Sequence, residues 1–163
     1  MAINRQQKEN IVKTGAENVN ESNALIFTDF SGVNVTDMNS LRSTLRELGS
    51  KFKVIKKRLL GVILKDKKIE LDPLKYEGEL GTVFVKGDIS EIAGPLYRFA
   101  KDHNTFKLLG AYDLEKREEI DETTINAIGS LPPKEVLLGQ VVGSIVAPIR
   151  SLLHILSEKS KQS

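Results

Sequence analysis

The 163-residue sequence contains no cysteine and only two histidines, His103 and His154. The absence of cysteine excludes disulfide bonds, thiolate metal ligands and cysteine nucleophiles, and it suits a reducing cytosol. The two histidines lie far apart in the sequence, and neither has carboxylates around it at the spacing of metal ligands. The sequence therefore predicts no metal site.

The common catalytic motifs are missing as well. No glycine-rich loop matches the phosphate cradles of nucleotide-binding proteins, and no Gly-x-Ser-x-Gly sequence is present. Carboxylates are numerous, but acidic residues on helices and loops usually serve solubility. We therefore expect no enzyme activity, no cofactor and no small-molecule substrate.

Positive charge is concentrated in one part of the chain. Residues 51–68 contain eight Lys or Arg and one Asp, a net charge of +7, whereas the whole chain carries only +2. An acidic block, DLEKREEIDE, occupies residues 113–122. A clustered basic field attracts polyanions even when the whole protein is nearly neutral. The alternative is a solvated helix face with no partner.

Apolar periodicity and turn residues predict nine elements in alternating order. Helices are predicted at residues 5–19, 36–48, 59–64, 92–104 and 123–128, and strands at 24–30, 51–56, 82–86 and 106–112. Hairpin signals are absent. The pattern predicts an α+β fold, with a mixed sheet layered with helices in a globular domain at residues 1–131. After Pro132 and Pro133, residues 132–163 are expected to form a tail with a long projecting helix.

The basic block has a distinctive arrangement. In the predicted strand, Lys51 and Lys53 point to one side, and Phe52 and Val54 point to the other side and into the core. The cations at residues 56–58 come where this strand meets the next helix. The N-terminus of a helix favours phosphate and disfavours cations, so three cations there indicate an anionic partner.

The tail contains an apolar stretch at residues 136–156, in which thirteen of twenty-one residues are apolar and Arg150 is the only charged one. On a helical wheel the large apolar residues fall within about half of the circumference, and Gly, Ser, Gln, Arg150 and His154 occupy the other half. The apolar half consists of Leu137, Leu138, Val141, Val142, Ile145, Val146, Ile149, Leu152, Leu153, Ile155 and Leu156. A helix of this length is about 30 Å long.

Three surfaces could cover the apolar half of this helix: a bilayer, the globular domain or another protein. The run without charge ends at residue 149, which is short for a hydrocarbon core that needs about 20 residues. Apart from Arg150, the polar half carries Gly, Ser and Gln where an interfacial helix would have Lys and Arg. The globular domain already has its own elements and core. We therefore expect a protein partner and no membrane.

The apolar pattern of the tail repeats. The large aliphatic residues at positions 141, 142 and 145 recur at 152, 153 and 156. A step of eleven residues corresponds to about 3.67 residues per turn, so both sets lie on nearly the same face. Two similar patches on one face indicate two similar partners.

Several motifs occur in an order that is known from one family. They are Phe30-Ser31-Gly32, the helix LRSTLR at 41–46 followed by Gly49, and VIKKRL at 54–59, and they continue through GTVFVKGD, FAKDHNTFKLLGA and LPPKEVLLGQVVGSIVAPIRSLLHIL. This set resembles the bacterial ribosomal L-ten family, which anchors the stalk of the large ribosomal subunit. The chain departs from the family at Ser31, where a basic residue is usual, and at Lys57 and Arg58, where Asn-Thr is usual.

The resemblance implies a cytoplasmic, ribosome-bound protein. Its globular part would bind large-subunit ribosomal RNA at the stalk base, beside the neighbouring L-eleven protein. Its tail would bind two dimers of the acidic stalk protein, one on residues 137–147 and one on 148–158; some members have a third segment. The expected RNA contacts are Arg5, Lys8, Ser31, Gly32, Lys53, Lys56, Lys57 and Arg58.

A second hypothesis remains open from the residues alone. The chain could be a non-ribosomal RNA-binding regulator whose C-terminal helix drives self-assembly. Such a protein would form homo-oligomers without an acidic partner.

Overall fold

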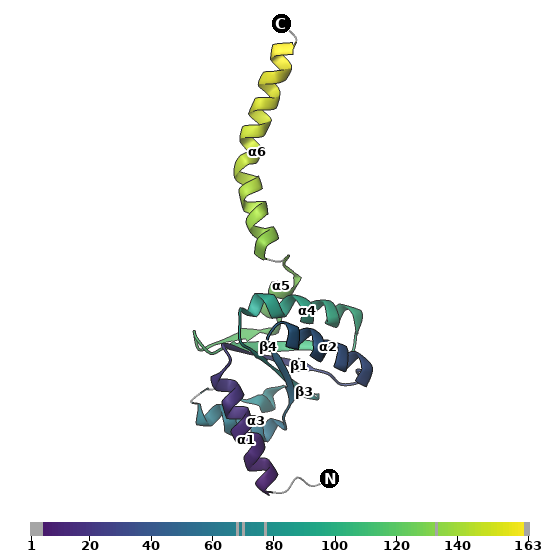
Figure 1. The fold of residues 1–163 in the computed structure, drawn as a ribbon, viewed down its shortest axis with the longest axis vertical. Coiled ribbons are helices and arrows are strands. Elements are labelled where there is room, and N and C mark those ends of the chain that lie inside the picture. Colours follow the sequence, from purple (N-terminus) through teal and green to yellow (C-terminus); the bar gives the residue numbers. More distant parts are fainter. Residues whose placement is uncertain (1–4, 68, 70, 77, 133, 162–163) are drawn as a thin grey trace. The chain divides into compact units, whose positions relative to one another are not determined.

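The computed structural model describes residues 5–67, 69, 71–76, 78–132 and 134–161, and it divides into two compact units, Met1–Leu131 and Pro132–Ser163 (Figure 1). The elements of the first unit are α1 (Arg5–Asn20), β1 (Ala24–Asp29), α2 (Val35–Glu47), β2 (Lys51–Val54), α3 (Lys57–Asp66), a 3-10 turn η1 (Pro73–Lys75), β3 (Leu80–Val85), α4 (Ile89–Asp102), β4 (Lys107–Asp113), β5 (Glu118–Asp121) and α5 (Glu122–Ser130). The second unit consists of one helix, α6 (Lys134–Lys161).

The five strands form one sheet in the order β2-β3-β1-β4-β5. The central strand β1 pairs with β3 on one side and with β4 on the other. It is buried from Ala24 to Thr28, which accounts for its nearly continuous apolar sequence. Among the described strands β2 pairs only with β3, so its other edge has no neighbouring strand within the part of the chain that the structure describes.

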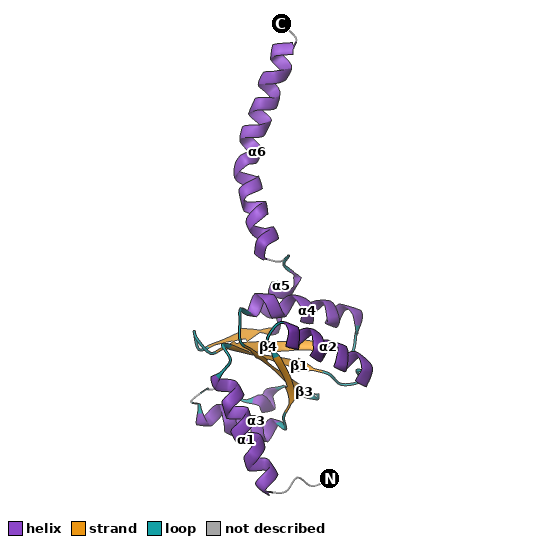
Figure 2. Cartoon of the chain, in the orientation of Figure 1, coloured by secondary structure: helices purple, strands orange, loops and turns teal. Residues whose placement is uncertain are grey.

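Helices cover both faces of this sheet, as Figure 2 shows for α2 and α4 on one face and α1 and α3 on the other. Alternate residues of β1 pack into two separate hydrophobic cores. Ile26 packs with Leu45 of α2 and Leu96 of α4, and Phe27 packs with the buried face of α3. The first unit is therefore a three-layer α+β structure.

The end of α2 shows how short sequence signals set the boundaries. Gly49 adopts a φ of 73°, a left-handed conformation that glycine tolerates. The N–H of Ser50 donates to the carbonyl of Leu45 at 2.8 Å, as in a Schellman motif. Asp88 caps α4 by accepting from the N–H of Ser90 at 3.1 Å. By contrast, the N-cap residue of α2, Asn34, makes no side-chain capping bond.

The α+β class is confirmed, but two details of the prediction were wrong. The sheet is not mixed, because each described pairing is antiparallel. The acidic block also contains a strand, β5, which forms a hairpin with β4. Asp113 begins the turn by accepting from the N–H groups of Glu115 and Lys116, and Arg117 completes it with a φ of 58°. The block has no apolar alternation, so its charge concealed the strand.

The orientation predicted for Val54 in the edge strand β2 was also wrong. Phe52 is buried as predicted, but the side chain of Val54 is 51% exposed. The strand ends at Val54, and it is Ile55, one residue later, that enters the core between the sheet and α3. The alternation expected over residues 51–56 therefore breaks where the chain leaves the sheet.

The helix of the second unit, α6, has 28 residues and contains Pro148 in its interior. At about 1.5 Å per residue it is roughly 42 Å long, longer than the 30 Å expected from the apolar stretch alone. Hydroxyls of Ser144 and Ser151 donate to backbone carbonyls one turn earlier, so these small polar side chains are satisfied within the helix.

Candidate functional site

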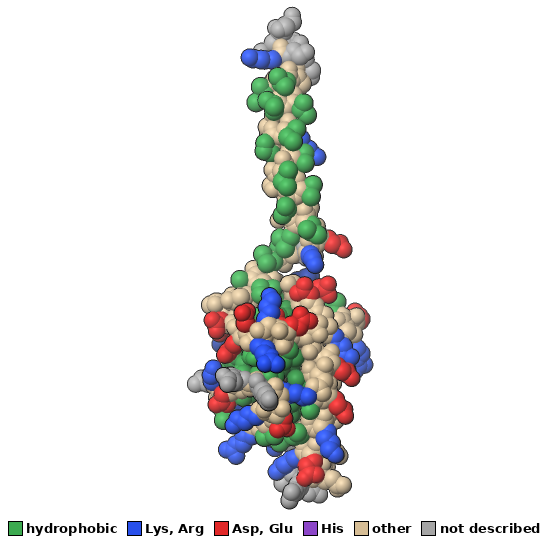
Figure 3. Space-filling view, turned by 90° about the vertical axis from the view of Figure 1, so that its left-hand side faces the viewer, with side chains coloured by type: hydrophobic (Ala, Val, Ile, Leu, Met, Phe, Trp, Pro, Cys, Tyr) green, Lys and Arg blue, Asp and Glu red, His purple; other side chains and the backbone are tan. Residues whose placement is uncertain are grey.

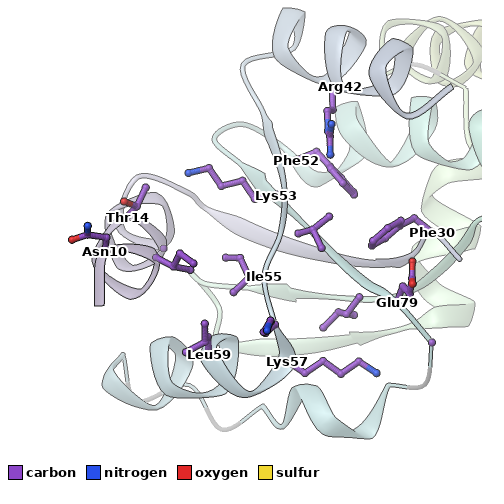
Figure 4. A pocket seen from close by; sticks show the side chains of 16 residues that line it. Asn10, Thr14, Phe30, Arg42, Phe52, Lys53, Ile55, Lys57, Leu59 and Glu79 are labelled. Atoms are coloured by element: carbon purple, nitrogen blue, oxygen red, sulfur yellow. The ribbon is translucent and has the colours of Figure 1, made fainter. Parts of the chain in front are cut away.

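A cleft of about 920 Å³ follows the free edge of β2. Its lining comes from five places in the sequence: α1, Phe30 just after β1, α2, residues 52–57 with Leu59, and residues 78–80. Figure 4 shows Arg42, Phe52 and Phe30 on one side of the strand and Lys53, Thr14 and Asn10 on the other. Four cations, Arg42, Lys53, Lys56 and Lys57, line the cleft against one carboxylate, Glu79.

Aromatic rings form one wall of the cleft. The rings of Phe30 and Phe52 meet edge to face, with centroids 6.2 Å apart and planes at 86°. The guanidinium of Arg42 lies over the ring of Phe52, 5.6 Å from its centroid, in a cation–π contact. Phe52 also packs so closely on Gly81 that a Cβ there would lie 2.5 Å from the ring. The Phe52 ring is thus held by its contacts with Phe30, Arg42 and Gly81.

The N-terminus of α3 lines the same cleft as this aromatic wall. Its N-cap residue is Lys56, and no side chain caps the helix there. A lysine ammonium only donates hydrogen bonds, so it cannot accept from the N–H groups of the first turn. Those N–H groups and the cationic side chains of Lys56 and Lys57 favour an external anion at the same point.

Lys57 is held in place by the neighbouring loop. Its ammonium donates to the backbone carbonyl of Tyr76 at 2.6 Å. The ring of Tyr76 stacks on that of Phe27, at 5.4 Å between centroids, and its hydroxyl donates to Glu119 of β5 at 3.4 Å. Burial, with the nearby charge of Glu119, raises the pKa of Tyr76 to about 12. This chain of contacts fixes the loop before β3, and with it one end of the cleft.

Asp29 joins the turn after β1 to the loop before β3. Its Oδ1 accepts from the N–H of Ser31 at 3.0 Å, the hydroxyl of Ser31 at 2.6 Å and the N–H of Glu79 at 3.1 Å. Burial raises the pKa of the Asp29 carboxyl, but these hydrogen bonds and the charge of Lys107 outweigh burial and leave the pKa below its ordinary value. Gly78 must be glycine here, because its φ is 77° and a Cβ would lie 2.2 Å from Asp29.

The eight RNA contacts expected from the sequence do not all lie in the cleft. Lys53, Lys56 and Lys57 line it, whereas Arg58 lines a second groove between α3 and η1. Three others are outside both: Ser31, which is bonded to Asp29; Gly32, exposed with a φ of 76°; and Lys8, exposed on α1. The side chain of Arg5, the first residue of α1, lies outside the described part.

One other member of the basic block, Lys51, is partly neutralised. Lys51 lies 3.5 Å from the carboxylate of Glu21, which also pairs with Lys86 at 2.8 Å. The bond from Lys86 is the main reason that the pKa of Glu21 is lowered. The block's net charge of +7 therefore overstates the charge that is available to a partner.

Sequence reasoning missed Arg42, Asn10, Thr14 and the aromatic wall. The helix pattern placed Leu41 and Leu45 in the core, which puts Arg42 at the border of the buried face of α2. Its position beside the basic strand follows only from the packing of α2 on β2. Among the described residues, no group of three or more His, Cys, Asp or Glu is placed to hold a metal ion.

The apolar face of α6 is open to solvent along the helix, as the green side chains in Figure 3 show. Of the eleven residues predicted to bind a partner, nine are 54–66% exposed. The other two, Leu137 and Val146, are less exposed. Contiguous apolar surface of this kind usually marks an interaction site.

The length and apolar composition of α6 would also allow it to cross a bilayer, over residues Lys134–Lys159. Two features count against a spanning role. Arg150 lies within the apolar stretch, and the half of the helix opposite the large aliphatic residues carries Gly139, Gln140, Gly143 and Ser144.

Comparison with known proteins finds a match to the family model of ribosomal protein L10 over residues 3–101. Among curated relatives, the large ribosomal subunit protein uL10 of Thermotoga neapolitana is 39% identical over 161 residues, which cover 95% of this chain and 89% of the relative. The uL10 proteins of Thermoanaerobacter pseudethanolicus and Clostridium tetani are 32% and 30% identical, and cover 96% and 94% of this chain and 88% of each relative.

These matches extend from the basic cleft into the apolar helix, and they agree with the resemblance that the motifs indicate. The family is one of structural proteins, which confirms the expectation that the chain is not an enzyme. The chain belongs to the ribosomal protein L10 family.

Proposed function

We propose that this chain is a constituent of the large ribosomal subunit, where its first unit binds ribosomal RNA at the stalk base and α6 carries dimers of the acidic stalk protein. The proposal places the protein on cytoplasmic ribosomes, next to the L-eleven protein. The observation that supports RNA binding most directly is the cleft at the edge of β2, in which four cations and the uncapped N-terminus of α3 face the same space.

Contacts with phosphates would account for the Lys and Arg side chains that gather on this surface. Lys and Arg that meet phosphates release counterions from the RNA, so affinity falls as salt rises. Folded RNA is recognised largely by its shape and backbone, which a basic surface on a rigid sheet edge can follow. The acidic β5 lies at the opposite edge of the sheet, so the RNA is expected on the β2 side.

The RNA part is tested by measuring affinity for a large-subunit ribosomal RNA fragment at several salt concentrations. In the variant Lys53→Gln/Lys56→Gln, the slope of log affinity against log salt should fall by about 0.7–0.9 for each phosphate that the variant no longer binds. Lys101→Gln is the control, because Lys101 is exposed on α4 and does not line the cleft. A double variant with the slope of the parent would reject the cleft as the RNA surface.

The exposed apolar face of α6 supports the second part of the proposal. Each large aliphatic side chain contributes about 1.5–3 kcal/mol when it is fully buried, offset by the cost of ordering both partners. The repeat at a step of eleven residues divides the face into residues 137–147 and 148–158. Two dimers of an acidic stalk protein would cover both segments.

Native mass spectrometry of the chain mixed with the acidic stalk protein of the same cell tests the number of dimers. One chain with four copies is the expected complex, and Ile145→Asp or Leu156→Asp should each reduce it to one chain with two copies. Six copies would retain the anchor but reject the division into two segments. Self-assembly of the chain without the acidic protein would favour the RNA-binding regulator instead.

A further inference from the structure

The cleft at the edge of β2 has features that phosphate binding leaves unexplained. Much of its lining is apolar, including Phe30, Ile55 and Leu59. A surface that contacts only phosphates needs cations and hydrogen-bond donors but no apolar hollow. One of its polar groups is moreover the carboxylate of Glu79, which repels phosphate.

We propose that the cleft holds one unpaired nucleobase of the bound RNA, stacked against Phe30 and the guanidinium of Arg42, with Glu79 accepting a hydrogen bond from the base. This inference rests on the proposed RNA-binding function and assigns a base-specific subsite within it. Sequence-specific recognition of RNA depends on unstacked bases that rest on aromatic rings or arginine planes.

The aromatic wall is suited to stacking. Phe52 packs on Gly81 and has the guanidinium of Arg42 over its ring, so it holds the guanidinium in place rather than receiving the base. Phe30, only half-buried, meets Phe52 edge to face and is the aromatic side chain with a surface left toward the cleft. Figure 4 shows Arg42 and Phe30 approaching Phe52 from different directions.

Hydrogen-bonding groups lie next to this wall. The backbone N–H of Glu79 is fixed by Asp29 and Ser31, so the start of its side chain is held at the mouth of the cleft. The N–H of Phe30 donates to the carbonyl of Glu79 at 3.2 Å, so the two residues, both labelled in Figure 4, are neighbours. An ionised carboxylate only accepts hydrogen bonds, and the exocyclic amino groups of adenine, cytosine and guanine donate them. Uracil has no amino group, and its one donor, N3–H, lies between two carbonyl oxygens that repel a carboxylate, so uracil should bind most weakly.

The space and the charges fit a nucleotide that is still attached to its chain. The volume of about 920 Å³ falls within the range of about 300–1,000 Å³ that is usual for ligand sites. Lys53 and Lys56 line the same cleft and can neutralise the flanking phosphates. The free edge of β2 adds backbone donors and acceptors from alternate residues.

Abasic substitution tests the proposal. The probe is the shortest large-subunit ribosomal RNA fragment that the chain retains, made with an abasic nucleotide at each unpaired position in turn. One position should weaken binding roughly tenfold, as expected when a stacked base is removed. At that position uracil should bind more weakly than the three other bases, and Glu79→Gln should reduce this difference.

Protein variants decide whether the base lies in this cleft. Phe30→Leu and Arg42→Lys should bind the parent RNA more weakly and show no further weakening with the abasic RNA. Arg42→Lys keeps the charge and removes the planar group, and Arg98→Lys on α4 is its matched control. Because Arg42 is exposed, this variant carries the test even if Phe30→Leu fails to fold.

Two results would overturn the inference while leaving RNA binding intact. One is equal affinity for the parent RNA and for all abasic RNAs, while Lys53→Gln/Lys56→Gln still reduces the salt dependence of binding. The other is an equal decrease in affinity for parent and abasic RNA in Arg42→Lys. If free adenosine monophosphate bound as tightly as the RNA, the cleft would be a nucleotide site instead. Absence of salt-dependent RNA binding would reject the proposed function itself.

Discussion

Replacement of Asp29 should loosen two loops at once. Its carboxylate accepts two hydrogen bonds from Ser31 and one from Glu79, so it joins the turn after β1 to the loop before β3. Both loops border the cleft, through Phe30 and through residues 78–80. Asp29→Ala removes the acceptor of both Ser31 donors, and it leaves the N–H of Glu79 with only its bond to the Ser31 hydroxyl at 3.1 Å.

The cost can be worked out from these bonds. A hydrogen bond to a charged group contributes about 1.5–3 kcal/mol when it is buried, and less when it is partly exposed. The Asp29 carboxyl is only partly buried, and two of its three donors belong to Ser31, two residues away. We therefore expect Asp29→Ala to lower the free energy of unfolding by about 2 kcal/mol. For a unit of this size, that is a drop in Tm of about 8 °C.

Tyrosine fluorescence during urea or thermal unfolding is a suitable assay. The three tyrosines, Tyr76, Tyr97 and Tyr112, all belong to the first unit, and the chain has no tryptophan. The signal therefore reports on the first unit and is not affected by α6.

The pH dependence provides a second, independent readout. Because the pKa of Asp29 is lower in the folded state than its ordinary value of 3.8, its ionised form stabilises the fold. This contribution is complete above that value and disappears as the pH falls through the lower, folded pKa. The stability difference between the parent and Asp29→Asn should be largest near neutral pH and should shrink in acid. A difference that stays constant from pH 7 to pH 3, or a change in stability well under 1 kcal/mol for Asp29→Ala, would refute the role given to this carboxylate.

Three further predictions concern other parts of the chain. Glu119→Gln should lower the pKa of Tyr76 from about 12 toward its ordinary value of 10, because it removes a nearby negative charge while burial remains; ultraviolet titration of the phenolate measures this. Gly81→Ala should destabilise the first unit by about 1–3 kcal/mol in urea unfolding, because the new methyl group would overlap the ring of Phe52, and a stability equal to the parent would contradict that packing. A chain that ends after Leu131 should keep the Tm of the parent in tyrosine fluorescence, since the first unit is compact without α6; a drop of several degrees would show that the helix contributes to its stability.

Elements with strong periodicity could be predicted from the sequence. The spacing of Met38, Leu41 and Leu45 located α2, and Gly49 located its end. These signals are local, because they depend on which side of one helix is apolar and on one backbone conformation. The buried strand β1 was also found from a local signal, its run of residues that favour strands.

Features that depend on pairing or on distant contacts could not be predicted in this way. The strand β5 has a single apolar residue that faces inward, Ile120, and its partner β4 decides its conformation. The antiparallel order of the sheet follows from which strands become neighbours, which no local pattern encodes. The residues of the candidate site fall into the same two groups, those predicted from local signals and those placed by distant contacts. Lys53 and Lys56 were expected from a local charge run, whereas Phe30 and Arg42 reach the cleft only through the packing of elements from other parts of the sequence.

The central position of β1 also has a consequence for the order of events during synthesis. This strand is made early, but its two neighbours end at Val85 and Asp113. At about 5–20 residues per second, the last residue of β3 is added roughly 3–12 s after Ala24, and the last residue of β4 roughly 4–18 s after it. Until Val85 has been made both edges of this buried strand are unpaired, and until Asp113 has been made one edge remains unpaired. The nascent chain is therefore most prone to aggregation before residue 113 has been made, and slowing translation within the first two thirds of the message should lower the yield of folded protein more than slowing it in the segment that encodes α6.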